Sequence, residues 1–260
     1  MIIRETEHHF VMTTQHEHAS FSGKVASCFK ENLFLDSSYM SDVLIAIKEH
    51  DRGWIRLDDT PVWNDRHMAP CSFGEYPLLP KLVLYRKGLD EIEQINQYAA
   101  LICSMHFSSF KHLQQSKQTE CIDFIHHETE RQKRIKAGLA HPGENIVERH
   151  FKLLQLSDEI SLYVCFNRPG AAKEEEHPWY RAGFETIIDG QKINARWANS
   201  KEIVISPFLF EKEFTASIKI KYVAKDFINQ IGLSAAYKET DLTEQVVTFR
   251  AGENNRKLNQ

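Results

Sequence analysis

The spacing of apolar residues predicts a mainly helical chain up to about residue 167. Between Gln15 and Phe34, apolar or small residues such as Val25 and Phe29 recur with the 3.6-residue period of a helix packed on a core. The same period predicts further helices over residues 39–50, from 90 onwards, 120–136 and 146–166. Asp90 followed by Glu93 resembles a capping box, which places a helix start at Asp90.

The pattern then changes to the alternation of β-strands. Residues 168–180 contain the Pro and Gly residues of a loop. Residues 214–222 alternate strictly, with Ala216, Ile218 and Ile220 on one face, which predicts a half-buried antiparallel strand. Residues 202–206 and 245–250 are its expected companions, and the β-prone residues near Ile2 and Phe10 predict a short strand at the start of the chain.

These patterns predict a mainly α fold with a small β appendage. The helical core, of about five or more helices, is expected over residues 1–167, with an antiparallel β-sheet appendage over 168–250 packed on it and a loose polar tail over 251–260. Residues 52–89 are rich in Pro, Trp and Gly, so they are expected to form a long lid-like loop.

Composition narrows the classes of function. Of the 260 residues, 42% are hydrophobic and 26% are charged, so a folded core is expected rather than disorder. The net charge of −4 provides no basic field for a nucleic acid. Five cysteines without a C-x-x-C pair argue against a disulfide framework. No apolar run approaches 18 residues and the N-terminus is polar, so we expect no membrane partner, a cytoplasmic location and, as an open possibility, a homo-oligomer.

Five polar residues occupy positions where the helical period demands apolar ones. His18 leads the stripe that continues through Val25, His50 and Asp51 extend the apolar face of the second helix, and His106 and Asp158 fall on the core faces of the later helices. A lone buried carboxylate costs several kcal/mol unless it is paired or binds a cation.

Each of these residues alone also has an ordinary explanation. A single histidine on an apolar face is often a core residue that donates to a carbonyl, and Asp158 alone could pair with Arg149. Together, imidazoles and carboxylates from distant helices are reconciled most easily if they surround one divalent metal ion, whose charge the acids need. The sequence therefore predicts a metal site at His18, His50, Asp51 and Asp158.

The sequences around these residues resemble the HD superfamily of metal-dependent phosphohydrolases. The resemblance rests on QHEHASFSGKVA for the first histidine, VLIAIKEHDRGW for the His-Asp pair and KLLQLSDEISLYVC for the last aspartate. Within that superfamily the chain is similar to an uncharacterised bacterial family marked by Gln15-x-x-His18-Ala19, Ser22-Gly23, His50-Asp51-x-Gly53-Trp54, Ser104-x-His106 and Pro207-Phe208. The resemblance implies an HD-like helical bundle in which His18, His50, Asp51 and Asp158 are the metal ligands.

Such a site suits hydrolysis of a small, phosphorylated substrate such as a metabolite or a nucleotide. Nitrogen and oxygen ligands without thiolate suit Mn, Fe, Ni, Mg or Zn. By analogy, Asp51 would both ligate the metal and steer the nucleophile, and His106 would protonate a leaving group or ligate a second ion. Arg52, directly after the pair, is a candidate to hold a phosphate, as are Arg66, Lys81 and Arg86 in the long loop. Trp54, Trp63 and Phe73 could wall a pocket for a flat ring.

Two other functions stay open at this point. Some HD-like proteins bind paired irons for oxygen chemistry, and the histidines His106, His126, His127 and His150 could supply the extra ligands of a di-iron oxygenase. Alternatively, the ligands could form a structural site in a non-catalytic metal-binding or sensing module whose β region docks a partner.

Overall fold

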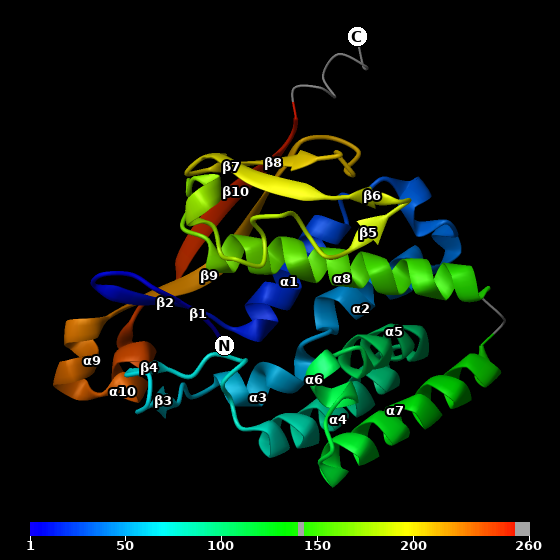
Figure 1. Ribbon diagram of the computed structural model, residues 1–260, viewed down its shortest axis with the longest axis horizontal. Coiled ribbons are helices and arrows are strands. Elements are labelled where there is room, and N and C mark those ends of the chain that lie inside the picture. The colour runs from blue at the N-terminus through cyan, green and yellow to red at the C-terminus, as the bar shows by residue number, and fades with distance from the viewer. Residues whose placement is uncertain (140–142, 253–260) are drawn as a thin grey trace.

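A six-stranded sheet and a group of helices share one core in the computed structural model, which describes residues 1–139 and 143–252 (Figure 1). The strands follow the order β1-β2-β9-β10-β8-β7, and every neighbouring pair is antiparallel except the parallel pair β10–β8. The strands are β1 (Ile2–Glu5), β2 (His9–Thr13), β7 (Asn194–Asn199), β8 (Glu202–Ser206), β9 (Phe214–Ala224) and β10 (Thr243–Ala251). Two hairpins add β3 (Trp63–Asn64) with β4 (Ala69–Pro70), and β5 (Ile187–Ile188) with β6 (Gln191–Lys192).

Helices fill the segments between the first two strands and β5, and two more follow β9. They are α1 (Gln15–Ala26), α2 (Met40–Glu49), α3 (Ile55–Asp58), α4 (Leu78–Ile95), α5 (Gln97–Ser108), α6 (Lys111–Gln114), α7 (Thr119–Gly138), α8 (Glu144–Phe166), α9 (Lys225–Ile231) and α10 (Leu233–Glu239). Short 3₁₀ turns are η1 (Glu31–Phe34), η2 (Ser37–Tyr39), η3 (Arg52–Trp54) and η4 (Lys173–Glu175). In Figure 1, α8 crosses the middle of the molecule, with β7, β8 and β10 above it and α4, α5 and α7 below it.

The alternation in β9 explains how the sheet packs on both sides. Ala216, Ile218 and Ile220 are buried in the main core, as the sequence predicts. Tyr222 on the same face is 38% exposed, whereas Val223 on the opposite face is fully buried in a second, smaller core with residues of α9 and α10. One face of β9 therefore packs on the main core, and the other face packs on the C-terminal helices.

The prediction of a mainly α fold is therefore only partly right, because the protein is a mixed α/β structure. The sheet is not confined to residues 168–250, since β2 from the N-terminus pairs with β9 and brings β1 with it. Nor is it purely antiparallel, since β8 and β10 run parallel. Local alternation identifies a strand but not its partner, which lies some 200 residues away in sequence for the β2–β9 pair.

Helix boundaries differ from the predicted ones in two places. The first helix ends at Ala26 rather than at Phe34. The expected lid-like loop over residues 52–89 is largely structured, because α4 begins at Leu78 and includes Asp90, which therefore caps no helix. The next helix begins after Asn96, whose extended backbone interrupts the helix and whose side chain accepts the N–H of Ala99. The tail expected over residues 251–260 lies outside the described residues from residue 253 onwards.

Candidate metal centre

Four helical segments bring the five predicted ligands to one place. His18 lies on α1, His50 is the residue after α2 and Asp51 follows it, His106 is in the last turn of α5, and Asp158 is in the second half of α8. These helices pack on one another in the main core, with α1 and α5 each contacting both α2 and α8. The site therefore arises where the apolar faces of α1, α2, α5 and α8 meet.

Local capping fixes where α1 begins and so where His18 points. Thr14 caps the helix by accepting the N–H of Glu17. The buried Asp58, on α3, accepts the N–H of Gln15 at 2.6 Å. Asp58 thus links the start of α1 to the segment that follows Asp51.

The ligand atoms are spaced like metal ligands, in two overlapping sets, which are His18, His50 and Asp51, and His50, His106 and Asp158. Asp158 Oδ1 lies 2.8 Å from His18 Nε2 and 3.5 Å from His50 Nε2. Asp51 Oδ2 lies 3.6 Å from His50 Nε2 and 4.0 Å from His18 Nε2. His106 Nε2 lies 4.0 Å from the other Asp158 oxygen. Ligands about 2.1 Å from a shared ion are separated by roughly 3 to 4 Å, so these atoms could hold a metal ion.

The imidazoles leave nitrogen atoms free for such an ion. His50 Nδ1 lies 2.7 Å from the carbonyl oxygen of Ile47, which makes Nδ1 the donor and leaves the Nε2 lone pair facing the site. His50 Nε2 is buried and makes no hydrogen bond among the described residues, although two carboxylates lie nearby. A buried nitrogen lone pair aimed at carboxylate oxygens is costly unless a cation or a proton lies between them.

Burial and charge shift the pKa values of the cluster in opposite directions. Burial opposes protonation of His50, but Asp51 and Asp158 outweigh it and raise the pKa of His50 to about 9. For Asp158, burial favours the neutral acid, but His18 and His50 outweigh it and hold the pKa of Asp158 well below its usual range. Burial raises the pKa of Asp51, with partial opposition from His50 and His18. Burial lowers the pKa of His106 to about 4, so its imidazole is neutral and able to ligate.

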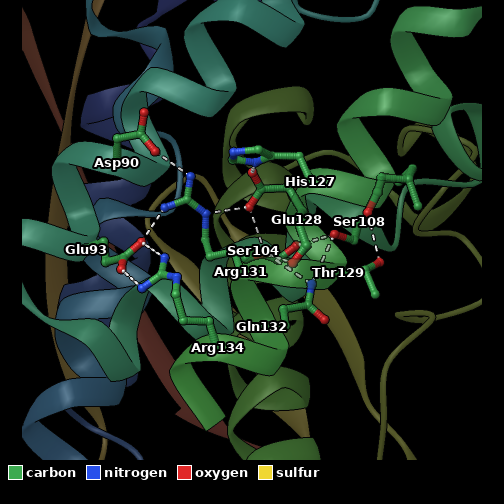
Figure 2. Close-up of polar contacts among 11 residues, drawn as sticks. Asp90, Glu93, Ser104, Ser108, His127, Glu128, Thr129, Arg131, Gln132 and Arg134 are labelled. Carbon is green, nitrogen blue, oxygen red and sulfur yellow. Dashed lines mark hydrogen bonds and ion pairs between the residues drawn. The ribbon is translucent and has the colours of Figure 1, made fainter. Parts of the chain in front are cut away.

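A buried polar network holds the opposite side of the helix that carries His106 (Figure 2). Ser104 Oγ donates to Oε2 of Glu128 at 2.9 Å, and Arg131 Nε donates to the same oxygen at 2.9 Å. Glu128 is fully buried and Arg131 is 4% exposed. The other nitrogens of Arg131 bind Asp90 and Glu93 on α4. The network therefore joins α4, α5 and α7 behind the site.

The remaining sequence candidates lie outside this cluster. Arg52 donates to Glu49 at 3.0 Å and to Glu91 at 2.8 Å, so its charge is already paired. His126 is exposed, and His127 contacts Glu128. His150 is buried between the hydroxyl of Tyr98 and the carbonyl of Phe34.

The aromatic residues and the other cations are distributed differently. Trp54 is 1% exposed and belongs to the main core, and the ring of Trp63 packs on Phe10. Arg66 is exposed and Arg86 is half-buried. Lys81 is buried and makes no ion pair within the described parts of the chain.

Gln15, which belongs to the motif around His18 but received no chemical role from the sequence, is a further buried polar residue of α1. Gln15 is 4% exposed and lies one helical turn before His18, and its side-chain oxygen has no hydrogen-bond partner among the described residues. Its place three residues before His18 on the same helix face is the sequence signal that could have identified it.

Comparison with known proteins identifies a family. A model of the family described as "Protein of unknown function (DUF3891)" matches residues 1–225. The chain belongs to this family. The matched region of the DUF3891 family contains all five clustered residues, from His18 to Asp158. No curated protein and no solved structure matches the chain. Within the described residues, no helix has both the length and the apolar character needed to cross a membrane.

Proposed function

We propose that the protein is a metal-dependent hydrolase of HD type that acts on a small phosphorylated metabolite or nucleotide. The observation that carries the proposal is the convergence of His18, His50, Asp51, His106 and Asp158 from four helical segments, with neighbouring ligand atoms 2.8–4.0 Å apart. The order of these residues along the chain, with an adjacent His-Asp pair in the middle, supports the HD assignment.

The site combines the features that hydrolysis requires. A divalent ion bound there would lower the pKa of a water molecule and offset charge on a phosphoryl oxygen. Asp51, adjacent in sequence to one ligand and buried in the cluster, would orient the attacking water. Asp158 is the most accessible of the set, with an 18% exposed side chain, which supports access for a substrate from that side.

The geometry favours His106 as a ligand rather than as a proton donor. Its Nε2 is grouped with His50 and Asp158 in a set that could hold an ion. A pKa of about 4 leaves little imidazolium at neutral pH to protonate a leaving group. This set overlaps a second set of His18, His50 and Asp51, and the overlap is the feature that keeps a di-iron oxygenase as the alternative function.

The test is metal analysis combined with a substrate panel. Protein purified without oxygen is assayed for metal content, then with Mn, Mg, Ni, Zn and Fe against sugar phosphates, nucleoside monophosphates and p-nitrophenyl phosphate. We expect about one equivalent of metal, and ester turnover that is lost in Asp51→Ala and kept in His126→Ala, the control on the exposed face of α7. Metal-loaded protein that attacks none of the esters would contradict a phosphohydrolase. Two irons per chain with an oxygen-sensitive spectrum would favour the oxygenase.

A further inference from the structure

Lys81 is a buried cation that the centre described above does not use. Its side chain is 6% exposed, and its ammonium donates to one acceptor, the carbonyl oxygen of Phe73 at 3.1 Å. Among the described residues no carboxylate lies within ion-pair distance of it. A lysine ammonium has three donors, so two remain without a protein partner. A buried charge without a counter-ion is costly, and such a group is retained where a ligand supplies the missing charge.

Lys81 shares a face of α4 with residues that approach the segment after Asp51. One turn further along the same face lies Tyr85, which is 5% exposed and whose pKa is raised first by burial and then by the charge of Asp51. One turn beyond Tyr85, Gly88 packs directly on Gly53 of η3, the turn that follows Asp51. The face of α4 that carries Lys81 is therefore the face that contacts the His-Asp segment.

The charge of Lys81 also acts on the segment that follows His106. The ring of Phe110 lies edge-on to His106, with centroids 5.0 Å apart, and His112 stacks on Phe110 at 5.7 Å. The pKa of His112 is lowered by burial and then by the charge of Lys81.

The N-terminal end of α4 adds to the positive electrostatic potential around Lys81. α4 spans 18 residues, begins at Leu78 and has no side-chain cap at its first residue. The free N–H groups and the dipole at such a helix start favour negative charge. Lys81 lies within this first turn, so a single surface presents both an unpaired ammonium and a helix start.

We propose that Lys81 is an anion-binding residue that holds the phosphoryl group of a substrate beside the His/Asp centre. The assignment rests on the proposed function for the identity of the anion as a phosphoryl group. It also replaces Arg52 in the role of phosphate ligand, because the guanidinium of Arg52 is already bound by Glu49 and Glu91.

The test is binding of inorganic phosphate, measured by calorimetry on the full chain with and without Mn²⁺. Three variants are compared with the wild type: Lys81→Met, Lys81→Arg, and Lys87→Met as the control. Lys87 is exposed on the same helix, so its loss changes the net charge equally without touching the buried site. Circular dichroism and metal content verify that each variant is folded and carries the His/Asp centre.

We expect phosphate affinity to fall at least about tenfold in Lys81→Met, to recover in part in Lys81→Arg, and to stay unchanged in Lys87→Met, since a charge-assisted hydrogen bond contributes that much. Equal affinity in the wild type and Lys81→Met, or no phosphate binding to the wild type at millimolar concentration, overturns the assignment.

The outcome separates the two proposals. If esters are hydrolysed but Lys81→Met binds phosphate as the wild type does, the role of Lys81 is wrong and the proposed function stands. If phosphate binds through Lys81 but no ester is hydrolysed, Lys81 is confirmed as an anion site and the phosphohydrolase is wrong. Lys81→Arg keeps the question decidable should the methionine variant fail to fold.

Discussion

The raised pKa of His50 predicts that pH acts in opposite directions on the metal-free and the metal-bound protein. In the metal-free protein, Asp51 and Asp158 outweigh burial and raise the pKa of His50 from 6.5 to about 9. A group with a raised folded-state pKa contributes stability that is complete below its unfolded pKa and is lost as pH rises through the folded value. The contribution of His50 to the stability of the metal-free protein should therefore be lost as pH rises from 6.5 to 9.

The size of the effect follows from the two pKa values. At about 1.4 kcal/mol per pKa unit, the shift from 6.5 to about 9 corresponds to about 3 kcal/mol of the free energy of unfolding. The pKa of Asp51 is also raised, mainly by burial, so its titration likewise lowers the free energy of unfolding as pH rises. Asp158, whose pKa is depressed by His18 and His50 against the effect of burial, contributes only in acid and leaves this window unchanged.

A bound cation reverses the pH dependence of stability, because the cation binds only the neutral imidazole of His50. Metal affinity should rise about tenfold per pH unit below pH 9, with release of about one proton per metal bound. With metal in excess, stability therefore rises with pH over the range in which the metal-free protein becomes less stable.

Urea unfolding at pH 6.5, 7.5 and 8.5 measures how the free energy of unfolding changes with pH, with EDTA for the metal-free protein and with excess Mn²⁺ for the metal-bound protein. Calorimetry in two buffers of different ionisation enthalpy counts the protons released. Asp158→Asn is the informative variant, because it removes one carboxylate that raises the pKa of His50, and both slopes should flatten. Metal affinity independent of pH from 6.5 to 8.5, with no proton release, would refute the reasoning.

Two further predictions concern the packing around the centre. In Gly88→Ala, the added Cβ would lie 2.5 Å from the backbone nitrogen of Gly53, so α4 must move away from the turn after Asp51. We expect the free energy of unfolding, measured in urea, to fall by about 1–3 kcal/mol and Mn²⁺ binding to weaken. Gly138→Ala, whose added Cβ meets nothing within 4 Å, should change neither quantity. In Arg131→Met, the fully buried Glu128 loses its cation, and we expect a loss of about 3–5 kcal/mol in the same assay. Lys133→Met, exposed on the same helix, is the control, and a loss below about 1 kcal/mol for Arg131→Met would show that the network is dispensable.

The ligand cluster could be predicted from sequence because each member violates a local period. A histidine or an aspartate at an apolar helix position is visible without knowledge of the fold, and the structure brings His18, His50, Asp51, His106 and Asp158 together. The sheet could not be predicted as fully, since the pairing of β2 with β9 depends on contacts between opposite ends of the chain. The start of α4 at Leu78 could not be predicted, because Pro80 suggests a loop. A proline is nevertheless tolerated in the first turn of a helix.

The basic side chains Arg52 and Lys81 also show what sequence reveals and what only the fold reveals. The sequence suggested Arg52, directly after the His-Asp pair, and Lys81, in the expected long loop, as candidate phosphate ligands. Their difference depends on acids that only the fold brings near. Glu91 on α4 pairs with Arg52 across 39 positions, whereas no described acid pairs with Lys81. Which charge is free is therefore a property of the tertiary structure.

The helix ends around the centre favour charges of opposite sign. α2 ends immediately before His50, and α5 ends two residues after His106, so the C-terminal ends of both helices point their negative dipoles at the ligands. Together with Asp51 and Asp158, they favour a cation. α4, by contrast, presents its N-terminal end with Lys81, which favours an anion. A substrate whose phosphoryl oxygens lie between the two sides would satisfy both, so losing Lys81 should weaken phosphate binding without releasing the metal.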